Sequence, residues 1–364
     1  MWKTAHEHVL KLVAYEPGKP VEELAREMGL QPSEIIKLAS NENPLGPSPK
    51  ALAAMREALD RAHFYPDGGG WALRGALAEK LGLQRENVVL GNGSNEIIEF
   101  IGHALMRPGV DVIVSQYSFA IYPIMAKLFG ANVITVPAKD FGHDLKAMVA
   151  AITPNTRVMF VATPNNPTGT LSSKGELAEL VNQVPPHVML VIDEAYIEFL
   201  KDPVDFLPLI RRGDFPNILL MRTFSKIFGL AGLRVGYGIG HPEVIAALEK
   251  IRQPFNLNLP AQIGAMAALD DLDHVMKTRA LNQAGLDFYE LAFRKLGLEF
   301  IPSAANFILV KVGDGQKAFL GLQQRGVITR PMVGYGLPEW LRISVGTGAE
   351  NERCIAALTQ VLGK

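Results

Sequence analysis

Short apolar runs that alternate with segments of helical spacing constrain this 364-residue chain more than any other feature. The runs are rich in β-branched residues and lie around 88–90, 111–115, 132–136, 157–162, 188–192, 217–221 and 235–239. Segments of helical periodicity lie between several of them, at 94–106, 119–129, 172–183 and 241–252. This alternation predicts an α/β fold with a mostly parallel, seven-stranded sheet. Ligands bind such sheets at the carboxyl ends of the strands.

The pattern changes after residue 258, which predicts a smaller α+β domain over residues 259–364. Its expected elements are a long helical stretch at 259–296, strands at 305–311 and 340–345, and a terminal helix at 349–362. Prolines interrupt residues 1–45, so this segment is expected to wrap around the body as an arm and to join the small domain. Residues 46–258 are then expected to form the large domain.

Composition excludes several classes of partner. Lys and Arg number 36 against 37 Asp and Glu, so no global field favours nucleic acid or an anionic membrane. The apolar runs are far shorter than the roughly 20 residues that span a bilayer, and the N-terminus lacks the pattern of a signal peptide. The single cysteine, Cys354, excludes an intrachain disulfide and a metal site of several thiolates, so we expect a cytoplasmic protein without a metal.

Two turns follow predicted strands and carry polar groups. GNGSNE, at 91–96, opens a helix, so its free N–H groups can hold a phosphate; plain chain reversal explains it equally well. The absence of GxGxxG and GKS/T patterns argues against dinucleotide and nucleoside triphosphate folds. TPNNPTG, at 163–169, is a turn in which an asparagine between prolines can aim its amide at a ligand oxygen, or can simply make the turn.

Two further motifs place charges beside apolar strands. Asp193 follows HVMLVI and needs a cationic partner, which is either a structural ion pair or a protonated ring nitrogen of a ligand. Lys226 stands between Ser225 and Ile227 in a run poor in other charges. Desolvation there lowers the pKa of a lysine and leaves the neutral amine that a Schiff base requires. Arg234 is placed to meet a phosphate together with Thr223 and Ser225.

Taken in order, GNGSNE, TPNNPTG, DEAY and TFSKIFGLAGLR resemble the cofactor motifs of fold-type I aminotransferases, which bind pyridoxal 5'-phosphate. SNENPLGPSP, YPDGGG and the GLAGLRVGY run are similar to those of histidinol-phosphate aminotransferases in particular. The likeness extends from about Tyr15 to Arg342. It implies a large domain with the seven-stranded sheet, a small α+β domain, and a homodimer with shared active sites.

The resemblance also implies roles for individual residues. Lys226 matches the lysine that binds the cofactor, Asp193 the partner of its ring nitrogen, and Tyr196 a ligand of its phenolic oxygen. The remaining cofactor contacts are Asn166 at the phenolic oxygen, Phe119 stacked on the ring, and Gly93, Ser94, Asn95, Thr223, Ser225, Arg234 and Tyr65 around the phosphate, Tyr65 from the neighbouring subunit. The substrate contacts are Tyr15, Asn43, Tyr122, Arg330 and Arg342. Local packing is the other interpretation of Tyr65 and Tyr122.

The implied reaction moves an amino group from histidinol phosphate to 2-oxoglutarate, and it gives imidazole acetol phosphate and glutamate in histidine biosynthesis. An aromatic amino-acid aminotransferase would use the same cofactor motifs, and a decarboxylase of phosphorylated amino acids shares the fold. The same fold also occurs as an effector-binding module fused to a DNA-binding domain. The short, proline-interrupted arm and the lack of a basic recognition helix disfavour that non-enzymatic alternative.

Overall fold

The seven apolar runs form one sheet in the computed structural model, which describes residues 4–15 and 18–364. Its strands are β2 (Val88–Gly91), β3 (Asp111–Ser115), β4 (Asn132–Val136), β5 (Thr156–Ala162), β6 (Met189–Asp193), β7 (Ile218–Thr223) and β8 (Gly236–Gly240). Their order is β2-β8-β7-β6-β5-β3-β4, and β8 runs antiparallel to both of its neighbours. The remaining pairs are parallel, which confirms the predicted α/β fold.

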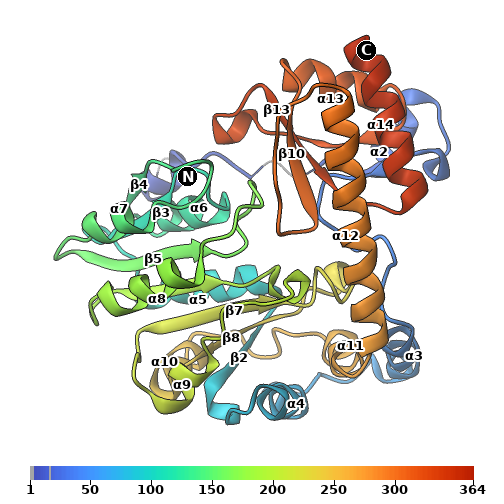
Figure 1. Cartoon of the computed structure of the whole chain (residues 1–364). Helices are drawn as coiled ribbons and strands as arrows, with labels where there is room; N and C mark the ends of the chain where they lie inside the picture. The colour runs from blue at the N-terminus through green and yellow to red at the C-terminus, as the bar shows by residue number, and fades with distance from the viewer. Residues whose placement is uncertain (1–3, 16–17) are drawn as a thin grey trace.

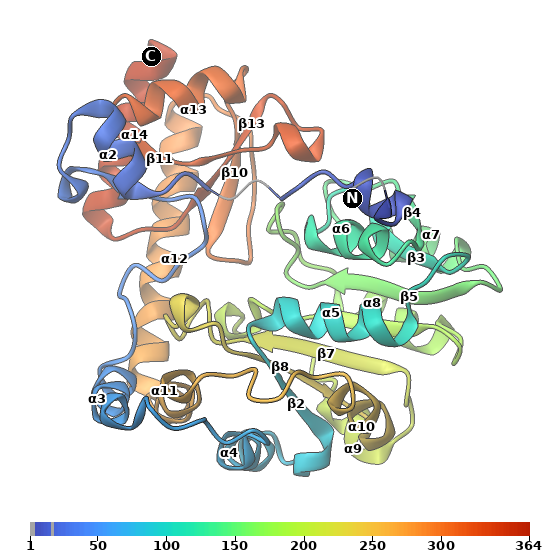
Figure 2. The ribbon, with the colours of Figure 1, turned by 180° about the vertical axis from the view of Figure 1, so that it is seen from behind.

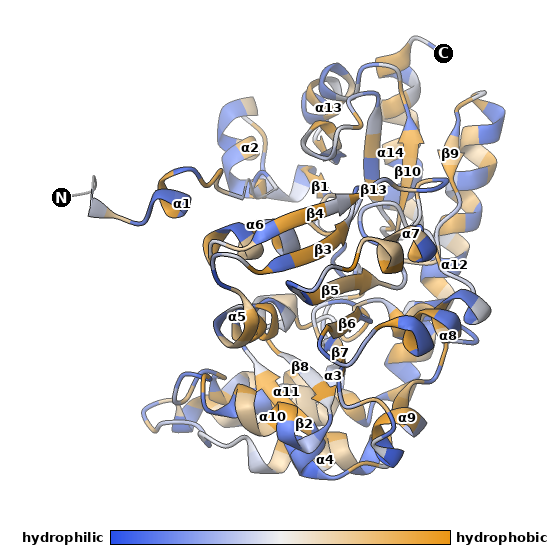
Figure 3. Cartoon of the chain, turned by 90° about the vertical axis from the view of Figure 1, so that its left-hand side faces the viewer, coloured by the Kyte–Doolittle hydropathy of each residue, from blue (hydrophilic) through white to orange (hydrophobic). Residues whose placement is uncertain are grey.

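Helices cover both faces of this sheet because successive strand residues point to opposite sides. Val88 and Leu90 lie in one core, and Val89 between them lies in the other. One core is closed by α5 (Ser94–Leu105), α6 (Ile121–Leu128) and α10 (Pro242–Glu249). The other is closed by α4 (Trp71–Leu81), α7 (Leu145–Ala150), α8 (Lys174–Gln183), α9 (Leu207–Arg212) and α11 (Leu259–Leu269). Figure 3 shows the apolar strands between these layers.

A second body stands above the large sheet (Figure 1). Its four-stranded sheet has the order β12-β13-β10-β9 and pairs antiparallel throughout. The elements are β9 (Phe300–Ile301), β10 (Phe307–Lys311), β12 (Arg330–Pro331), β13 (Trp340–Ser344), α12 (Leu272–Lys295), α13 (Gly315–Gln323) and α14 (Gly348–Leu362). Tyr289 and Phe293 of α12 are fully buried with Ile308 and Leu358, so this body has its own core.

The expected helical stretch at 259–296 is two helices. Asp271 ends the continuity, since its carboxylate accepts a hydrogen bond from the His274 N–H at 3.3 Å and caps α12. The buried residues Ala261 and Ala265 of α11 belong to the core of the large sheet. α11 also packs on α3 (Pro49–Ala58). The boundary at 258/259 stays a prediction, and we propose that α12 itself divides the two cores.

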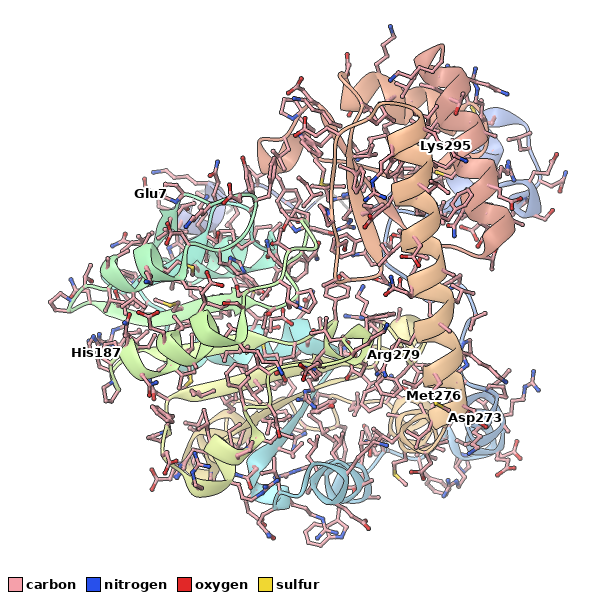
Figure 4. The ribbon with its side chains drawn as sticks, viewed as in Figure 1. Glu7, His187, Asp273, Met276, Arg279 and Lys295 are labelled. Carbon is pink, nitrogen blue, oxygen red and sulfur yellow. The ribbon has the colours of Figure 1, made fainter. Side chains whose placement is uncertain are left out.

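α12 connects the two bodies along one side of the molecule (Figures 1 and 2). Figure 4 shows Arg279 on its lower half, beside the large body, and Lys295 at its upper end. The Arg279 guanidinium donates to the main-chain oxygen of Glu198 from Nε at 2.9 Å and from Nη2 at 2.5 Å. These bonds fix the helix to the loop that follows β6.

The predicted arm contacts both bodies. α1 (Glu7–Leu10) lies on α6, whereas Leu24 and Ala25 of α2 (Val21–Met28) pack against Ile328 in the small body. β1 (Ile36–Lys37) pairs in parallel with β11 (Val327–Ile328). Residues 1–3 and 16–17 of the predicted arm lie outside the described residues. Within the described part of the chain, no helix combines the length and apolar character needed to cross a membrane.

A buried ion pair lies under the end of β6. Glu194 is almost fully buried, and its Oε2 accepts a hydrogen bond from Nε of Arg222 at 2.7 Å. We expect Glu194→Gln to lower the free energy of unfolding by roughly 3 kcal/mol, because the guanidinium then stays buried without its anionic partner. Urea denaturation of the purified protein measures this change.

The surface pair Lys174–Asp202 is the matched control, since its two ends lie 2.5 Å apart and both are solvent-exposed. Asp202→Asn is expected to change the unfolding free energy by less than about 1 kcal/mol. Equal, small effects of the two substitutions would show that burial adds nothing to the Glu194–Arg222 pair.

Candidate active site

A cavity of about 390 Å³ opens where the carboxyl ends of β5, β6 and β7 face the small body. The parallel direction of these strands brings their terminal polar residues to the same edge. The predicted site residues that line the cavity are Tyr15, Ser94, Asn95, Phe119, Tyr122, Asn166, Asp193, Tyr196, Thr223, Ser225, Lys226, Arg234, Arg330 and Arg342. The large body, the small body and the arm all contribute to this one cavity.

Lys226 lies in the turn after β7 and is half-buried. Burial lowers the pKa of its amine to about 8, and the positive charges of Arg342 and Arg234 act in the same direction. Its Nζ donates to the main-chain oxygen of Ser40 at 3.2 Å. A lysine with this pKa is partly neutral near pH 8, as a nucleophilic amine must be.

Asp193 ends β6 as a buried carboxylate, with Oδ1 accepting from the Ala195 N–H at 3.0 Å. Its Oδ2 accepts a hydrogen bond from the Tyr122 hydroxyl at 2.6 Å. Burial raises the pKa of Asp193, while the Tyr122 bond opposes that shift. The structural ion pair considered for this position is instead made by its neighbour Glu194 with Arg222.

Tyr122 is fully buried, and its ring stacks on Phe160 with centroids 4.5 Å apart. Its one hydroxyl proton is donated to Asp193. The substrate contact expected for Tyr122 stays a prediction, since this residue also lines the cavity. The sequence does not reveal the hydrogen bond to Asp193, because its two residues are far apart in the chain. Tyr122 lies in the first turn of the helix after β3, whereas Asp193 ends β6.

Tyr196 is buried, and burial raises the pKa of its hydroxyl to about 12. The hydroxyl oxygen accepts a hydrogen bond from Nδ2 of Asn41 at 2.9 Å. Asn41 lines the cavity but was not among the predicted site residues. Asn41 belongs to the SNENP motif, which was the available signal, but within this motif Asn43 was predicted instead.

Asn43 does not line the cavity. Its Nδ2 donates to the Ile227 main-chain oxygen at 2.7 Å and to Oγ1 of Thr278 at 3.2 Å, and its Oδ1 accepts from the Leu45 N–H at 2.9 Å. Asn43 therefore holds the loop after Lys226, and the substrate contact expected for it stays a prediction.

Arg342 occupies the small-body side of the cavity and is only 8% exposed. Nη1 donates to Oδ1 of Asn166 at 2.5 Å and Nη2 to the Ala39 main-chain oxygen at 2.8 Å. Its Nε is buried and has no hydrogen-bond partner. No carboxylate of the described residues forms an ion pair with this guanidinium, so its charge is available for an anionic ligand.

The opposite end of the cavity is an anion cradle. Gly93 caps α5 with a φ of +78°, and a Cβ at this position would collide with the Arg234 guanidinium. The N–H groups of the first turn, including those of Ser94 and Asn95, have no partner within the helix. Ser225 folds back on β7, where the Thr223 hydroxyl donates to its Oγ at 3.0 Å. Backbone donors, hydroxyls and a guanidinium together suit a phosphate.

Comparison with known proteins identifies the family. The model of aminotransferase classes I and II matches residues 33–358. A histidinol-phosphate aminotransferase of Akkermansia muciniphila is 54% identical over 359 residues, covering 98% of each chain. The chain belongs to the class I and II aminotransferase family. A second relative, histidinol-phosphate aminotransferase 2 of Pseudomonas fluorescens, is 51% identical and covers 98% of this chain and 96% of its own length.

Among solved structures, this aminotransferase is similar to histidinol-phosphate aminotransferase from Sinorhizobium meliloti in complex with pyridoxal-5'-phosphate. The TM-score is 0.89 at 29% identity, with 99% of this chain and 98% of that chain covered. These similarities confirm the family resemblance seen in the motifs, and the aminotransferase uses pyridoxal phosphate. The cradle at Gly93, the carboxylate of Asp193 and the amine of Lys226 provide the donors and charges that this cofactor requires.

Tyr65 lies outside the cavity and is 81% exposed, with its ring stacked on Phe255 at 4.7 Å. Local packing therefore exists at this position, as the alternative interpretation held. The contact uses one face of the ring and leaves most of the side chain in solvent.

We expect Tyr122→Phe to lower kcat roughly tenfold, because a hydrogen bond to a charged group contributes about 1.5–3 kcal/mol. The ring stack on Phe160 is kept, so the change isolates the hydroxyl. Losing this donor raises the pKa of Asp193 further, and the carboxylate then becomes neutral at a higher pH. The acid limb of the pH profile of kcat should accordingly shift to higher pH.

Tyr117→Phe is the control, since the ring of Tyr117 packs on Phe141 at 5.8 Å. We expect this variant to keep the wild-type pH profile. An unchanged acid limb in Tyr122→Phe would show that the hydroxyl does not influence Asp193.

Proposed function

We propose that this aminotransferase moves the amino group of histidinol phosphate to 2-oxoglutarate, giving imidazole acetol phosphate and glutamate in histidine biosynthesis. The observation that best supports this proposal is the buried Arg342, whose Nε lacks a hydrogen-bond partner. It lines the same cavity as Lys226 and Arg330. Two guanidinium groups suit a phosphate dianion better than the single carboxylate of a neutral amino acid. The relatives at 54% and 51% identity carry the corresponding name.

We assign the cofactor to residues at the strand ends. The phosphate would lie against Gly93, Ser94 and Asn95 at the start of α5, with Thr223, Ser225 and Arg234 completing the cradle. Phe119 would stack on the ring, and Asp193 would face its nitrogen. Tyr196 and the amide of Asn166 would hold the phenolic oxygen, since the Nδ2 protons of Asn166 remain available while its Oδ1 accepts from Arg342.

When bound, pyridoxal phosphate supplies an electron sink for the carbon that loses its proton. Asp193 would keep the ring nitrogen protonated by its negative charge. Lys226 would hold the cofactor, and its amine would be the base and acid that moves the proton of the substrate carbon. Its depressed pKa, about 8, lets Nζ both accept and release a proton near neutral pH. Ping-pong kinetics follow because donor and acceptor use the same cavity in turn.

We assign substrate anions to the small-body side. Arg342 and Arg330 would bind the phosphate of histidinol phosphate in one half-reaction and a carboxylate of 2-oxoglutarate in the other. Tyr15 of the arm lies by Arg330, with the guanidinium carbon 5.6 Å from its ring centroid. The arm therefore borders the place where the substrate enters.

The competing aromatic aminotransferase function predicts a different substrate preference. We expect kcat/KM for histidinol phosphate to exceed that for phenylalanine by about a hundredfold, with 2-oxoglutarate as acceptor in both assays. Arg342→Lys should reduce this ratio, because an ammonium cannot reproduce the forked contact with an anion. A preference for phenylalanine in the wild-type enzyme would overturn the proposed substrate. Carbon dioxide release from a phosphorylated amino acid would indicate the decarboxylase.

We further propose a homodimer in which Tyr65 reaches the cofactor phosphate of the neighbouring subunit. The aromatic side chains around Tyr65 support an interface, since Phe64, Trp71 and Phe255 are 65%, 64% and 45% exposed.

We also infer a cytoplasmic location, which the buried free thiol of Cys354 suits. Recovery of the native enzyme outside the cytoplasm on cell fractionation would contradict it.

If the enzyme is a homodimer, light scattering should give twice the mass of one chain. We expect Tyr65→Phe to keep the dimer and to raise the dissociation constant for pyridoxal phosphate about tenfold, because one hydrogen bond to the phosphate is lost. Phe64→Leu, at the neighbouring position, is the control and should keep the wild-type constant. A monomer that binds the cofactor with full affinity would refute the shared site.

A further inference from the structure

Three consecutive residues between β1 and α3 bond three charged or polar side chains of the active site. The segment runs from Ala39 to Asn41 and lines the cavity. It belongs to the stretch of chain that passes from the small body to α3 (Figure 2). Its contacts are Arg342 Nη2 to Ala39 O at 2.8 Å, Lys226 Nζ to Ser40 O at 3.2 Å, and Asn41 Nδ2 to the Tyr196 hydroxyl oxygen at 2.9 Å. Ala39 and Ser40 use main-chain oxygens, whereas Asn41 uses its side chain.

The amide of Asn41 is held in one orientation. Its main-chain N–H donates to Oγ of Ser344 at 2.9 Å, which leaves the Ser344 hydroxyl proton free to be donated. That proton goes to Oδ1 of Asn41 at 3.0 Å. With Oδ1 occupied as an acceptor, Nδ2 faces Tyr196 as a donor. Asn41, Ser344 and Tyr196 are all buried, so water does not compete for these bonds.

The main chain fixes Asn41 as well. Its φ is +56°, a left-handed conformation that asparagine, aspartate and glycine tolerate better than other residues. The Asn41 carbonyl oxygen accepts from Nδ2 of Asn306 at 3.0 Å. The small body, through Ser344 and Asn306, therefore sets the position of a side chain that acts on the large body.

A tyrosine hydroxyl has one proton, and its direction depends on what the oxygen accepts. Because the Tyr196 oxygen accepts from Asn41, its proton cannot point to the same partner. Tyr196 lines the cavity, so the proton is left to point into it. We propose that Asn41 is a positioning residue, which turns the Tyr196 hydroxyl so that it donates to the phenolic oxygen of the bound cofactor. This inference rests on the proposed function in one respect, which is the position assigned to the phenolic oxygen of the cofactor beside Tyr196.

The test compares Asn41→Asp and Asn41→Gly in the holoenzyme, since both residues accept the left-handed backbone. A donor at the phenolic oxygen stabilises its anionic form, so losing the donor raises the pH midpoint of the cofactor's visible absorbance band. Aspartate accepts the Tyr196 proton and reverses the bond, and we expect the midpoint to rise by about one pH unit. Glycine frees the hydroxyl and should give a smaller rise, as should Ser344→Ala.

A double-variant cycle separates this effect from the added negative charge. In the Tyr196→Phe background, Asn41→Asp should cause no further rise, because the hydroxyl through which it acts is gone. A full rise in that background would show a charge effect and overturn the inference. Asn182→Asp, at an exposed position of α8, controls for a remote charge and should keep the wild-type midpoint.

The two proposals fail in different ways. If Tyr196→Phe itself leaves the midpoint unchanged, the assigned role of Tyr196 at the phenolic oxygen is wrong, whatever Asn41 does. If Tyr196→Phe raises the midpoint and all three other variants match the wild type, Asn41 does not position the hydroxyl. Should Asn41→Asp not fold, Asn41→Gly and Ser344→Ala decide the matter on the same absorbance titration.

Discussion

The common direction of the parallel strands is the constraint on which the rest of this structure depends. Polar side chains lie at or just after the ends of β5, β6 and β7, at the same edge of the sheet, although the three ends are far apart in the chain. The apolar bodies of the strands are buried on both faces, so the ligand-binding polar groups gather at this edge. Asn166, Asp193 and Lys226 are neighbours in space for this reason.

Among the described residues, charged groups of the active site such as Asp193 and Arg342 are hydrogen-bonded to neutral partners and do not form ion pairs with one another. Asp193 is stabilised by the Tyr122 hydroxyl and a main-chain N–H, and Arg342 by an amide and a carbonyl oxygen. Glu194 and Arg222 form an ion pair one layer below and so remove the adjacent carboxylate from the cavity. Neutral hydrogen-bond partners keep these groups ordered while their charges remain available to ligands. Aminotransferase chemistry requires this arrangement, since the cofactor and both substrates carry charge.

The small body is part of the active site and not only a cover for it. β13 supplies Arg342 and, two residues later, Ser344, which orients Asn41. α12 ties this body to the large one through Arg279, and the arm adds contacts to both. A shift of β13 relative to the sheet would therefore change the anion site and the Tyr196 hydrogen bond together.

The sequence by itself determined the seven strands of the large sheet and several of the helices that cover it, because apolar runs and turn motifs are local signals. The break at Asp271 and helices α3, α4, α7, α9 and α13 were not predicted, although Asp271 and Ser48 are capping residues at the starts of α12 and α3. Only the tertiary structure decided the partners of the site residues. Tyr122 meets Asp193 across 71 positions of the chain, and Asn41 meets Tyr196 across 155. Hydrogen bonds of this kind depend on how strands and bodies pack, and no spacing in the sequence encodes that geometry.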